Sequence, residues 1–464
     1  MYDLLLKHAT IVDPANGLHA VRDLAIQGRT VAAVEVDLPS DAAHRTLDLE
    51  GLHVVPGIID SHVHVCRPFG GTHGYTMMAR VGVTTAIDLA GYPEPILEGI
   101  GSARGMSIGF VYPIVPEVTV PDRDPDDATL TDLTHTALAK GALGTKILGG
   151  HYPITPEAAA RAIEVGHQAG AHVAVHAGTT ATGSNVDGVL ELLQLANGRR
   201  IQLAHVNSYC RGQITGDPIA EAATVLAALR EASGVVSESY LGLVNGAVAT
   251  CADGVPTSNV VKTCLRTGGF EATRGGLLLA IEAGWGLVNR VIDGETRLLS
   301  GEEGAAYFLE RDTQVGISFP VNSPGAGVSI ATNRRDGVRG AFTVDAISTD
   351  GGAYPRNTIV SQGLALVRYG ALSIDEFALK TSTNPAKMFG LDAKGHLGVG
   401  ADADITVLDL DTLTPYASVA RGQLIMQQGE LVGSGGCLLV TENAQRYLAQ
   451  HAPAPQADVV HVPR

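Results

Sequence analysis

The chain has 464 residues, 45% of them hydrophobic, and its 32 basic and 48 acidic side chains give a net charge of −16. This charge repels DNA and RNA, and no dense Lys/Arg cluster offsets it, so we expect no nucleic-acid partner. No leader pattern opens the sequence, no apolar run is long enough to cross a bilayer, and the five cysteines lack CxxC spacing. We therefore expect a cytoplasmic protein with reduced thiols and no membrane contact.

The first 55 residues contain short apolar runs separated by polar turn residues, a pattern typical of a small β-sheet. The stretch that follows residue 391, with ADADITVLDLDT and GQLIMQQGELVG, has the same character. Because chain termini often lie close together, we expect residues 1–55 and 392–464 to form one small β-sandwich domain from both chain ends, with a tail at the C-terminus.

Residues 56–391 alternate strand-like apolar runs with helical stretches. PEAAARAIEVGHQAG and IAEAATVLAALREA have a 3.6-residue apolar period, which predicts two amphipathic helices. Eight β units alternating with helices predict an α/β fold, a distorted TIM (β/α)8 barrel. One connection is too long for a barrel loop, and we expect residues 242–340 to form an inserted subdomain or lid.

His62 and His64 stand two residues apart in the strand-like run DSHVHV. Alternate side chains of a strand lie on one face, so the two imidazoles can converge on one metal ion. The HxH pattern alone is a weak signal. It gains weight because PGIID leads into it from the β-rich N-terminal segment.

Four further residues lie at or near the ends of later apolar runs. They are Lys146 in GTKILGG, His176 in VAVHAG, His205 in QLAHVNS and Asp350 in ISTDGG. Catalytic residues of a barrel gather where its strands end. A lone histidine there is more often a packed core residue, and a buried lysine is costly unless its charge is neutralised. The set as a whole therefore favours a metal site over packing.

These residues, together with PGIIDSHVH, TSTNPAKMFGL (381–391) and GHLGVGADADITVLD (395–409), resemble the amidohydrolase superfamily over nearly the whole chain. The resemblance implies a binuclear metal site. One ion would be bound by His62, His64 and Asp350, and the second by His176 and His205.

Lys146 resembles the superfamily lysine that reacts with CO2 to form a carbamate bridging both ions. A carbamate offers two anionic oxygens, whereas an ammonium group cannot ligate a cation. The alternative is a surface or substrate-binding lysine in a mononuclear enzyme. Two divalent ions are expected, with zinc as the default, while Mn, Fe, Co and Ni stay open.

The resemblance implies hydrolysis of a non-peptide carbon–nitrogen bond in a cyclic amide or an N-acyl amino acid. Metal-activated hydroxide would attack, and Asp350 would act as general acid and base. Lactone or ester hydrolysis on the same centre is the alternative. A mononuclear deaminase is disfavoured because Lys146 is present and AGTT, rather than an HxxE-type element, follows His176. A non-catalytic scaffold is disfavoured because all six ligands are present.

The chain does not match one branch of the superfamily. HVNS resembles the HVS-type motif of hydantoinases and dihydroorotases, but Cys66 stands where dihydroorotases have an arginine, and Arg67 would point to the opposite strand face. DGGAYPRN resembles D-aminoacylases, whose Asn-Cys-Gly metal-ligand motif is replaced here by DLAGYP (88–93). The substrate therefore stays open between the two branches.

Loops that leave the same barrel face carry the candidate substrate contacts. These are Asn207, Tyr209, Arg211, Tyr240, Tyr354 and Arg356. Either Arg211 or Arg356 could pair with a substrate carboxylate through a bidentate fork. His73, His151 and Cys66 are placed outside the site. By analogy with the superfamily, a homo-oligomer and a small-molecule substrate are expected.

Overall fold

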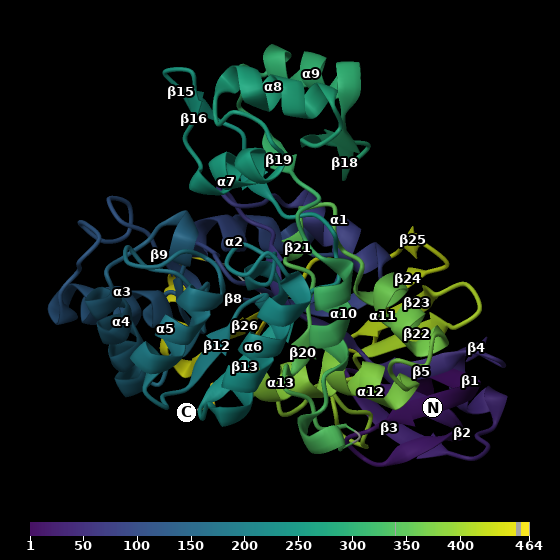
Figure 1. The fold of residues 1–464 in the computed structure, drawn as a ribbon. Helices are drawn as coiled ribbons and strands as arrows, with labels where there is room; N and C mark the ends of the chain where they lie inside the picture. Colours follow the sequence, from purple (N-terminus) through teal and green to yellow (C-terminus); the bar gives the residue numbers. More distant parts are fainter. Residues whose placement is uncertain (339, 452–455, 464) are drawn as a thin grey trace.

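The computed structural model describes residues 1–338, 340–451 and 456–463. Its architecture is α/β: a large mixed sheet lies at one side, parallel strands with outer helices form the body, and a small unit projects from the body (Figure 1). In the part of the chain that the structure describes, no helix is long and apolar enough to cross a membrane. Residues 452–455 and 464 of the expected C-terminal tail lie outside the described residues.

The large sheet combines strands from both chain ends, in the order β25-β24-β23-β22-β5-β1-β2-β3, with β4 beside β1. Its strands are β1 (Tyr2–Asp13), β2 (Leu18–Gln27), β3 (Thr30–Glu35), β4 (Ala43–Asp48), β5 (His53–Pro56), β22 (Ile405–Asp409), β23 (Thr414–Ala420), β24 (Gln423–Gln427) and β25 (Glu430–Leu431). The two ends join where Val54 of β5 pairs with Val407 of β22. The ends therefore meet in one sheet, and the two-layer sandwich stays a prediction.

Two six-stranded sheets, all parallel, form the body. The first has the order β20-β13-β12-β11-β10-β9 and the second β21-β6-β7-β8-β26-β27. The first comprises β9 (Tyr112–Ile114), β10 (Gly144–Ile147), β11 (His172–Val175), β12 (Ile201–Leu203), β13 (Val235–Ser239) and β20 (Ala346–Ile347). The second comprises β6 (Ile58–His64), β7 (Val83–Asp88), β8 (Ser107–Phe110), β21 (Gly351–Gly352), β26 (Cys437–Val440) and β27 (Gln456–Val459). Because the hydrogen bonds divide these strands into two sheets, the closed barrel stays a prediction.

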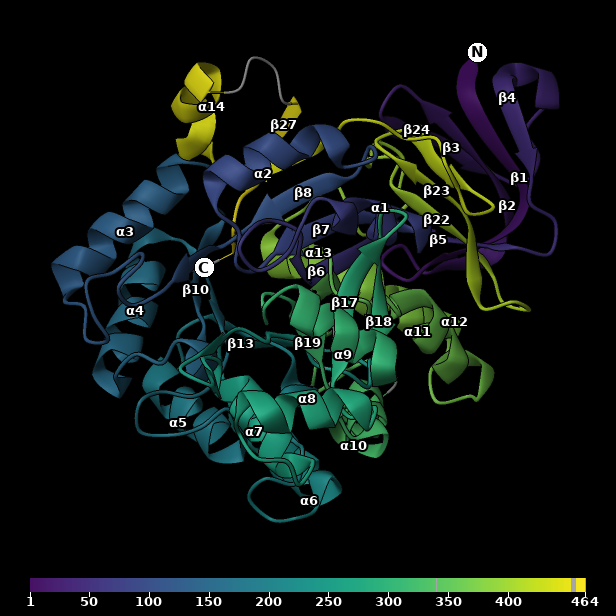
Figure 2. The same cartoon turned by 90° about the horizontal axis from the view of Figure 1, so that it is seen from above.

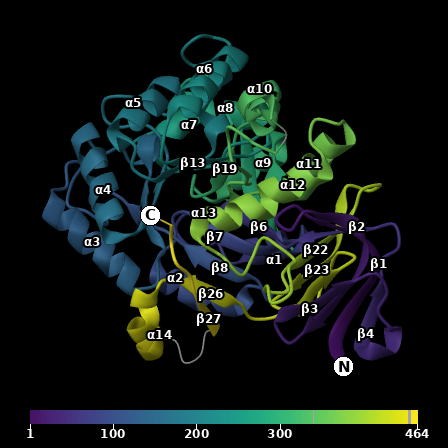
Figure 3. The same ribbon diagram turned by 90° about the horizontal axis from the view of Figure 1, so that it is seen from below.

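Helices lie along the outside of the parallel strands, as the row α3 to α6 shows (Figure 3). The helices of the body are α1 (His73–Arg80), α2 (Pro93–Gly99), α3 (Asp127–Ala139), α4 (Pro156–Ala169), α5 (Val186–Ala196), α6 (Pro218–Glu231), α10 (Pro324–Thr332), α11 (Ile359–Arg368), α12 (Ile374–Ala378), α13 (Asn384–Phe389) and α14 (Gln445–His451). The two helices predicted from apolar periodicity are confirmed as α4 and α6. The side chain of Thr155 caps α4 and that of Asp217 caps α6, which satisfies backbone N–H groups in the first turn.

The projecting unit has its own sheet, β14-β19-β17-β18, whose strands β17 to β19 lie near α8 and α9 (Figure 2). It also has its own hydrophobic core. Its elements are β14 (Ala247–Val248), β15 (Cys251–Ala252), β16 (Val255–Pro256), α7 (Asn259–Thr267), α8 (Arg274–Glu282), β17 (Leu287–Ile292), β18 (Glu295–Leu299), α9 (Gly301–Glu310) and β19 (Gly316–Ser318). The buried members of its core run from Ala247 to Phe319. The unit is thus narrower than the expected 242–340, because α10 packs against α6 of the body.

The end of the chain departs from the expected domain plan. We expected residues 392–464 to belong to the N-terminal β domain, yet only β22 to β25 do so. β26 pairs in parallel with β8, and β27 pairs with β26. All four residues of β26 are buried, so this apolar strand gains more burial within the parallel sheet than it would at an exposed edge.

Candidate metal centre

The six residues predicted to hold metal lie at the ends of different parallel strands. His62 and His64 end β6, Lys146 lies in β10, His176 directly follows β11, His205 follows β12, and Asp350 lies between β20 and β21. The parallel strands of each sheet end at one edge, and the strand ends of both sheets contribute to this place. The six residues line one cavity of about 420 Å³.

His62, His64 and Asp350 form a cluster that fits a metal ion. One donor atom from each residue lies within 4.8 Å of the others. Nε2 of His62 is 3.3 Å and Nε2 of His64 is 3.1 Å from Oδ1 of Asp350. Imidazole nitrogens and a carboxylate oxygen are ligands that zinc accepts, so the donor set suits such an ion.

His176 and His205 lie beside this cluster. The ring centroids of His176 and His205 are 4.4 Å apart, and those of His205 and His62 are 5.1 Å apart. Burial lowers the pKa of all three imidazoles. Lowered pKa values keep the rings neutral near pH 7, which is the protonation state that binds a metal.

Lys146 is buried, and its Nζ has no hydrogen-bond partner within the described residues. Burial lowers its pKa to about 8, although the charges of Glu238 and Asp350 oppose that shift. An unpartnered buried amine is rare in proteins, because its desolvation is not offset by any bond. The amine therefore fits a position where a further ligand or a covalent modification would satisfy it.

Glu238, in β13, is a central residue that the sequence analysis did not select. Its Oε1 accepts hydrogen bonds from Nδ1 of His62 at 2.7 Å and from the backbone N of His205 at 2.8 Å. Its Oε2 accepts a hydrogen bond from the hydroxyl of Ser348. Because Nδ1 of His62 donates to Glu238, its Nε2 is left unprotonated, which is the state in which it can bind a metal ion. The sequence offered one indication of this role, because a glutamate is unexpected in the apolar run GVVSESYLG.

Two buried aspartates support the strands that carry the site, and the sequence analysis also missed them. Asp60 accepts hydrogen bonds from the backbone N of Thr349 at 3.1 Å and from its hydroxyl at 2.5 Å. Burial raises the pKa of Asp60 to about 7. Asp88 accepts from the backbone N of Val65 and Cys66, just after His64. These contacts hold the chain before Asp350 and after His64 in place.

Asp350 is already paired with Arg356. Nη2 of Arg356 lies 2.7 Å from Oδ2 of Asp350, and its Nε donates to the backbone O of Asp350. Burial raises the pKa of Asp350, but the charge of Arg356 and the hydrogen bond with His64 outweigh it and hold that pKa well below its usual value. The role of Arg356 toward a substrate carboxylate stays a prediction, while its contact with Asp350 was not foreseen.

The other candidate substrate contacts divide into two groups. Arg211, Tyr240 and Tyr354 line the cavity together with Arg356. Asn207 and Tyr209 are buried and absent from its lining. Oδ1 of Asn207 accepts hydrogen bonds from the hydroxyl of Ser239 and the backbone N of Tyr240, and the Tyr209 hydroxyl accepts one from the backbone N of Ala177.

Of the residues expected outside the site, His151 does line the cavity, and its ring centroid is 4.9 Å from that of His176. His73 and Cys66 are not part of this lining. Nε2 of His73 instead contacts the hydroxyl of Thr296 at 2.9 Å. The expectation for His151 is therefore corrected: the short helix after β10 turns its ring toward the cavity.

We compared the chain with known protein families, sequences and solved structures. The model of the amidohydrolase family matches residues 313–432. A dihydroorotase of Anaeromyxobacter sp. (strain K) is 27% identical over 446 residues, covering 88% of each chain. Among solved structures, the N-acyl-D-glutamate deacylase of Bordetella bronchiseptica, complexed with zinc and a phosphonate inhibitor, has a TM-score of 0.66 at 16% identity, covering 94% of this chain and 98% of its own. The dihydropyrimidinase of Brevibacillus agri has a TM-score of 0.61 at 18% identity, covering 94% and 98%. The structural likenesses show the fold, and the family match over residues 313–432 shows that this part of the chain is similar to amidohydrolases.

Proposed function

We propose that this protein is an amidohydrolase that cleaves a non-peptide carbon–nitrogen bond of a small molecule, in an N-acyl amino acid or a cyclic amide. The observation that carries the proposal is the convergence of His62, His64 and Asp350 within 4.8 Å, in a cavity that also receives Lys146. The similarity to a dihydroorotase and to an N-acyl-D-glutamate deacylase supports these two substrate classes.

Two divalent ions would occupy this centre, with zinc as the first candidate. His62, His64 and Asp350 would hold one, and His176 and His205 the other. A CO2-derived carbamate on Lys146 would lie between them, and the unpartnered, buried Nζ supports this assignment. When bound, such ions lower the pKa of a water molecule and polarise a carbonyl group.

Asp350 is the general base and acid of the proposed reaction. Its lowered pKa keeps it ionised at neutral pH, so it can accept a proton from the attacking water. It would then deliver this proton to the leaving nitrogen. Glu238 would orient His62 by accepting a hydrogen bond from its Nδ1, which leaves Nε2 of His62 available to the proposed metal ion beside Asp350.

Arg211 is the better candidate for binding a substrate carboxylate. Its Nε donates to Oδ1 of Asn322 at 2.9 Å, and Asn322 in turn donates to the Tyr240 hydroxyl. Its two Nη groups have no hydrogen-bond partner within the described residues, and the side chain lines the cavity. A guanidinium fixed at one nitrogen and free at two suits a bidentate contact with a carboxylate.

We also propose a barrel and a sandwich domain for this chain. The two parallel sheets would together form the distorted (β/α)8 barrel over residues 56–391, and the sheet built from both chain ends would be the β-sandwich domain. The structural likeness to a deacylase and a dihydropyrimidinase, and the helices outside the parallel strands, support this arrangement.

Elemental analysis of the purified protein tests the metal centre. Protein expressed with added metal and bicarbonate should contain about two ions per chain, and Lys146→Ala should lose metal together with amidase activity. Lys387→Ala, which removes an exposed lysine of α13, should change neither. A single ion that is unaffected by Lys146→Ala would refute the carbamate, and mononuclear deacylase and deaminase substrates would then be tested first.

A further inference from the structure

A second cavity, of about 310 Å³, adjoins the metal cavity. The two share Ser184, Arg211, Asn259 and Val260 in their linings. Ser184 lies at the junction, because its hydroxyl is 2.8 Å from Nε2 of His176. The second cavity therefore opens beside the proposed metal ligands.

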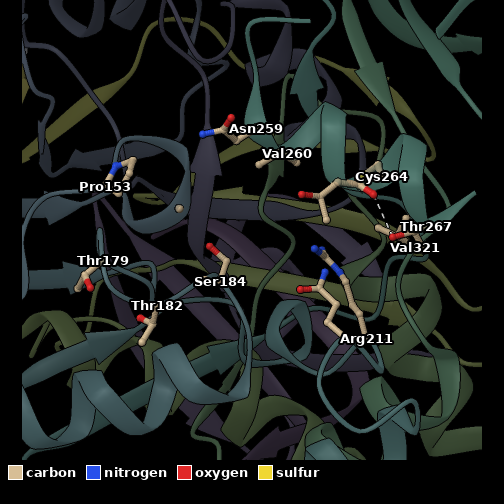
Figure 4. Close-up of a pocket in the computed structure, with 14 residues that line it drawn as sticks. Pro153, Thr179, Thr182, Ser184, Arg211, Asn259, Val260, Cys264, Thr267 and Val321 are labelled. Atoms are coloured by element: carbon tan, nitrogen blue, oxygen red, sulfur yellow. Dashed lines mark hydrogen bonds between the residues drawn. The ribbon is translucent and has the colours of Figure 1, made fainter. Parts of the chain in front are cut away.

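The walls of this cavity come from two parts of the molecule. The loops after β10 and β11 supply Pro153, Thr179 and Thr182 on one side (Figure 4). Helix α7 of the projecting unit supplies Asn259, Val260, Thr263, Cys264 and Thr267 on the other. The projecting unit thus completes a space that the body of the molecule leaves open.

Gly150 preserves the space at the junction. A Cβ atom added at Gly150 would collide with the Ser184 hydroxyl. Any larger residue would have to displace Ser184, which contacts His176. The absence of a side chain at this position keeps the passage between the two cavities clear.

The lining of the second cavity carries little charge. Arg211 is its one charged side chain, since burial raises the pKa of the Cys264 thiol and keeps it neutral. The hydroxyls of Thr179 and Thr182 donate to Glu191, so they offer oxygen acceptors to the cavity. A buried anion placed deep in this cavity would have no cation of its own if Arg211 binds another group.

We infer that the second cavity is the subsite for the side chain of an N-acyl amino acid, and that it accepts a neutral, extended side chain. The substrate carboxylate would lie at Arg211, and its side chain would run past Ser184 toward α7. This inference rests on the proposed function, and it favours an acyclic N-acyl amino acid over a compact cyclic amide, which would fill the metal cavity alone.

Calorimetric titration of the metal-loaded protein tests the subsite without requiring turnover. The ligands are both enantiomers of N-acetylnorleucine, N-acetylglutamine and N-acetylglutamate, with N-acetylglycine as the reference. At least one enantiomer of the norleucine or glutamine compound should bind about tenfold or more tightly than N-acetylglycine, because each buried methylene strengthens binding. The affinity of N-acetylglutamate should increase less, because the second cavity offers no further cation to pair with its side-chain carboxylate.

Matched variants on α7 test whether the tighter binding of long side chains depends on the second cavity. Thr263→Trp fills the cavity and should abolish the gain from the long side chain, and Thr267→Trp gives a second, independent test of the same wall. Arg266→Trp changes an exposed residue of the same helix outside the lining and should preserve the gain. Thermal unfolding of each variant checks that the fold is retained.

The outcomes separate the subsite from the proposed activity. Selective binding of long side chains without any hydrolysis would support the subsite and refute N-acyl amino acids as the substrate class of the proposed amidase. Hydrolysis with equal affinity for all side chains would refute the subsite and support the amidase proposal. The subsite is also refuted if no compound binds, if the glutamate compound binds most tightly, or if both tryptophan variants of the cavity wall keep the gain.

Discussion

Glu238 connects three parts of the candidate centre. One buried carboxylate accepts hydrogen bonds from the His62 ring, the His205 backbone and the Ser348 hydroxyl. These three partners come from three different segments of the chain. Since charge-assisted hydrogen bonds are strong and directional, Glu238 fixes the positions of His62 and His205 relative to each other.

Replacing Glu238 should weaken metal binding without removing a ligand. Glu238→Ala frees the His62 ring to rotate and to change tautomer, so metal affinity should fall about 10- to 100-fold. Glu238→Gln keeps an oxygen acceptor, so its metal affinity should fall less. Competition with a chelator measures the dissociation constants, with the exposed Glu231→Ala as control. Unchanged metal affinity in a folded Glu238→Ala protein would show that His62 is positioned by other contacts.

Single residues also show how far the sequence could predict the site. His62 was selectable from its HxH spacing with His64, and Asp350 because it ends an apolar run, where a polar side chain is unexpected. Glu238 was not selected, because alternation along SES does not say which of its polar side chains faces the histidines. The contact of Arg356 with Asp350 depends on the turn at Asp350, whose φ is +50°, and side-chain type does not reveal such a turn.

At the level of elements, Glu376 joins a helix start to a distant loop. Its side chain accepts from the backbone N of Ser373 while the Ser373 hydroxyl accepts from the Glu376 backbone N, which is a capping box at the start of α12. Glu376 also pairs with Arg334 at 2.6 Å and accepts from the backbone N of Gly340. Periodicity predicted α4 and α6, but a contact of this kind depends on tertiary packing and lies beyond such patterns.

The stability of the protein should depend on pH through Glu376. Burial raises its pKa, but the hydrogen bonds and charge of Arg334 outweigh burial and lower it from 4.5 to about 2. A lowered carboxyl pKa contributes stability above pH 4.5 that is lost as the pH falls toward 2, by about 3 kcal/mol in full. Urea unfolding should therefore show Glu376→Gln to be destabilised at pH 7 and much less so near pH 2. Glu430→Gln, at an exposed position, should match the unaltered protein at both pH values. An equal loss at both pH values would show that the charge of Glu376 does not contribute.

At the scale of the whole molecule, both ends of the chain are built into sheets. The pairing of β5 with β22 was predictable, because both ends have the alternation of short β-strands. The placement of β26 beside β8 was not, because the run CLLV predicts a buried strand but does not name its partner. Strand partners far apart in sequence are set by the packing of the complete fold, which no local pattern contains.

Strand β26, near the end of the chain, should therefore matter for global stability. Leu439 of β26 is fully buried in a cluster with Ile87 and Leu143, which lie beside strands that carry the site. Leu439→Ala leaves a cavity there and should cost about 2–5 kcal/mol, seen as a lower urea midpoint. Leu309→Ala, which truncates a leucine that is 48% exposed, should cost less than about 0.5 kcal/mol. If both variants shift the midpoint equally, β26 is only loosely attached and the parallel sheet is stable without the end of the chain. A large shift for Leu439→Ala alone means that the strands bearing the proposed metal ligands are held together in part by residues near the C-terminus.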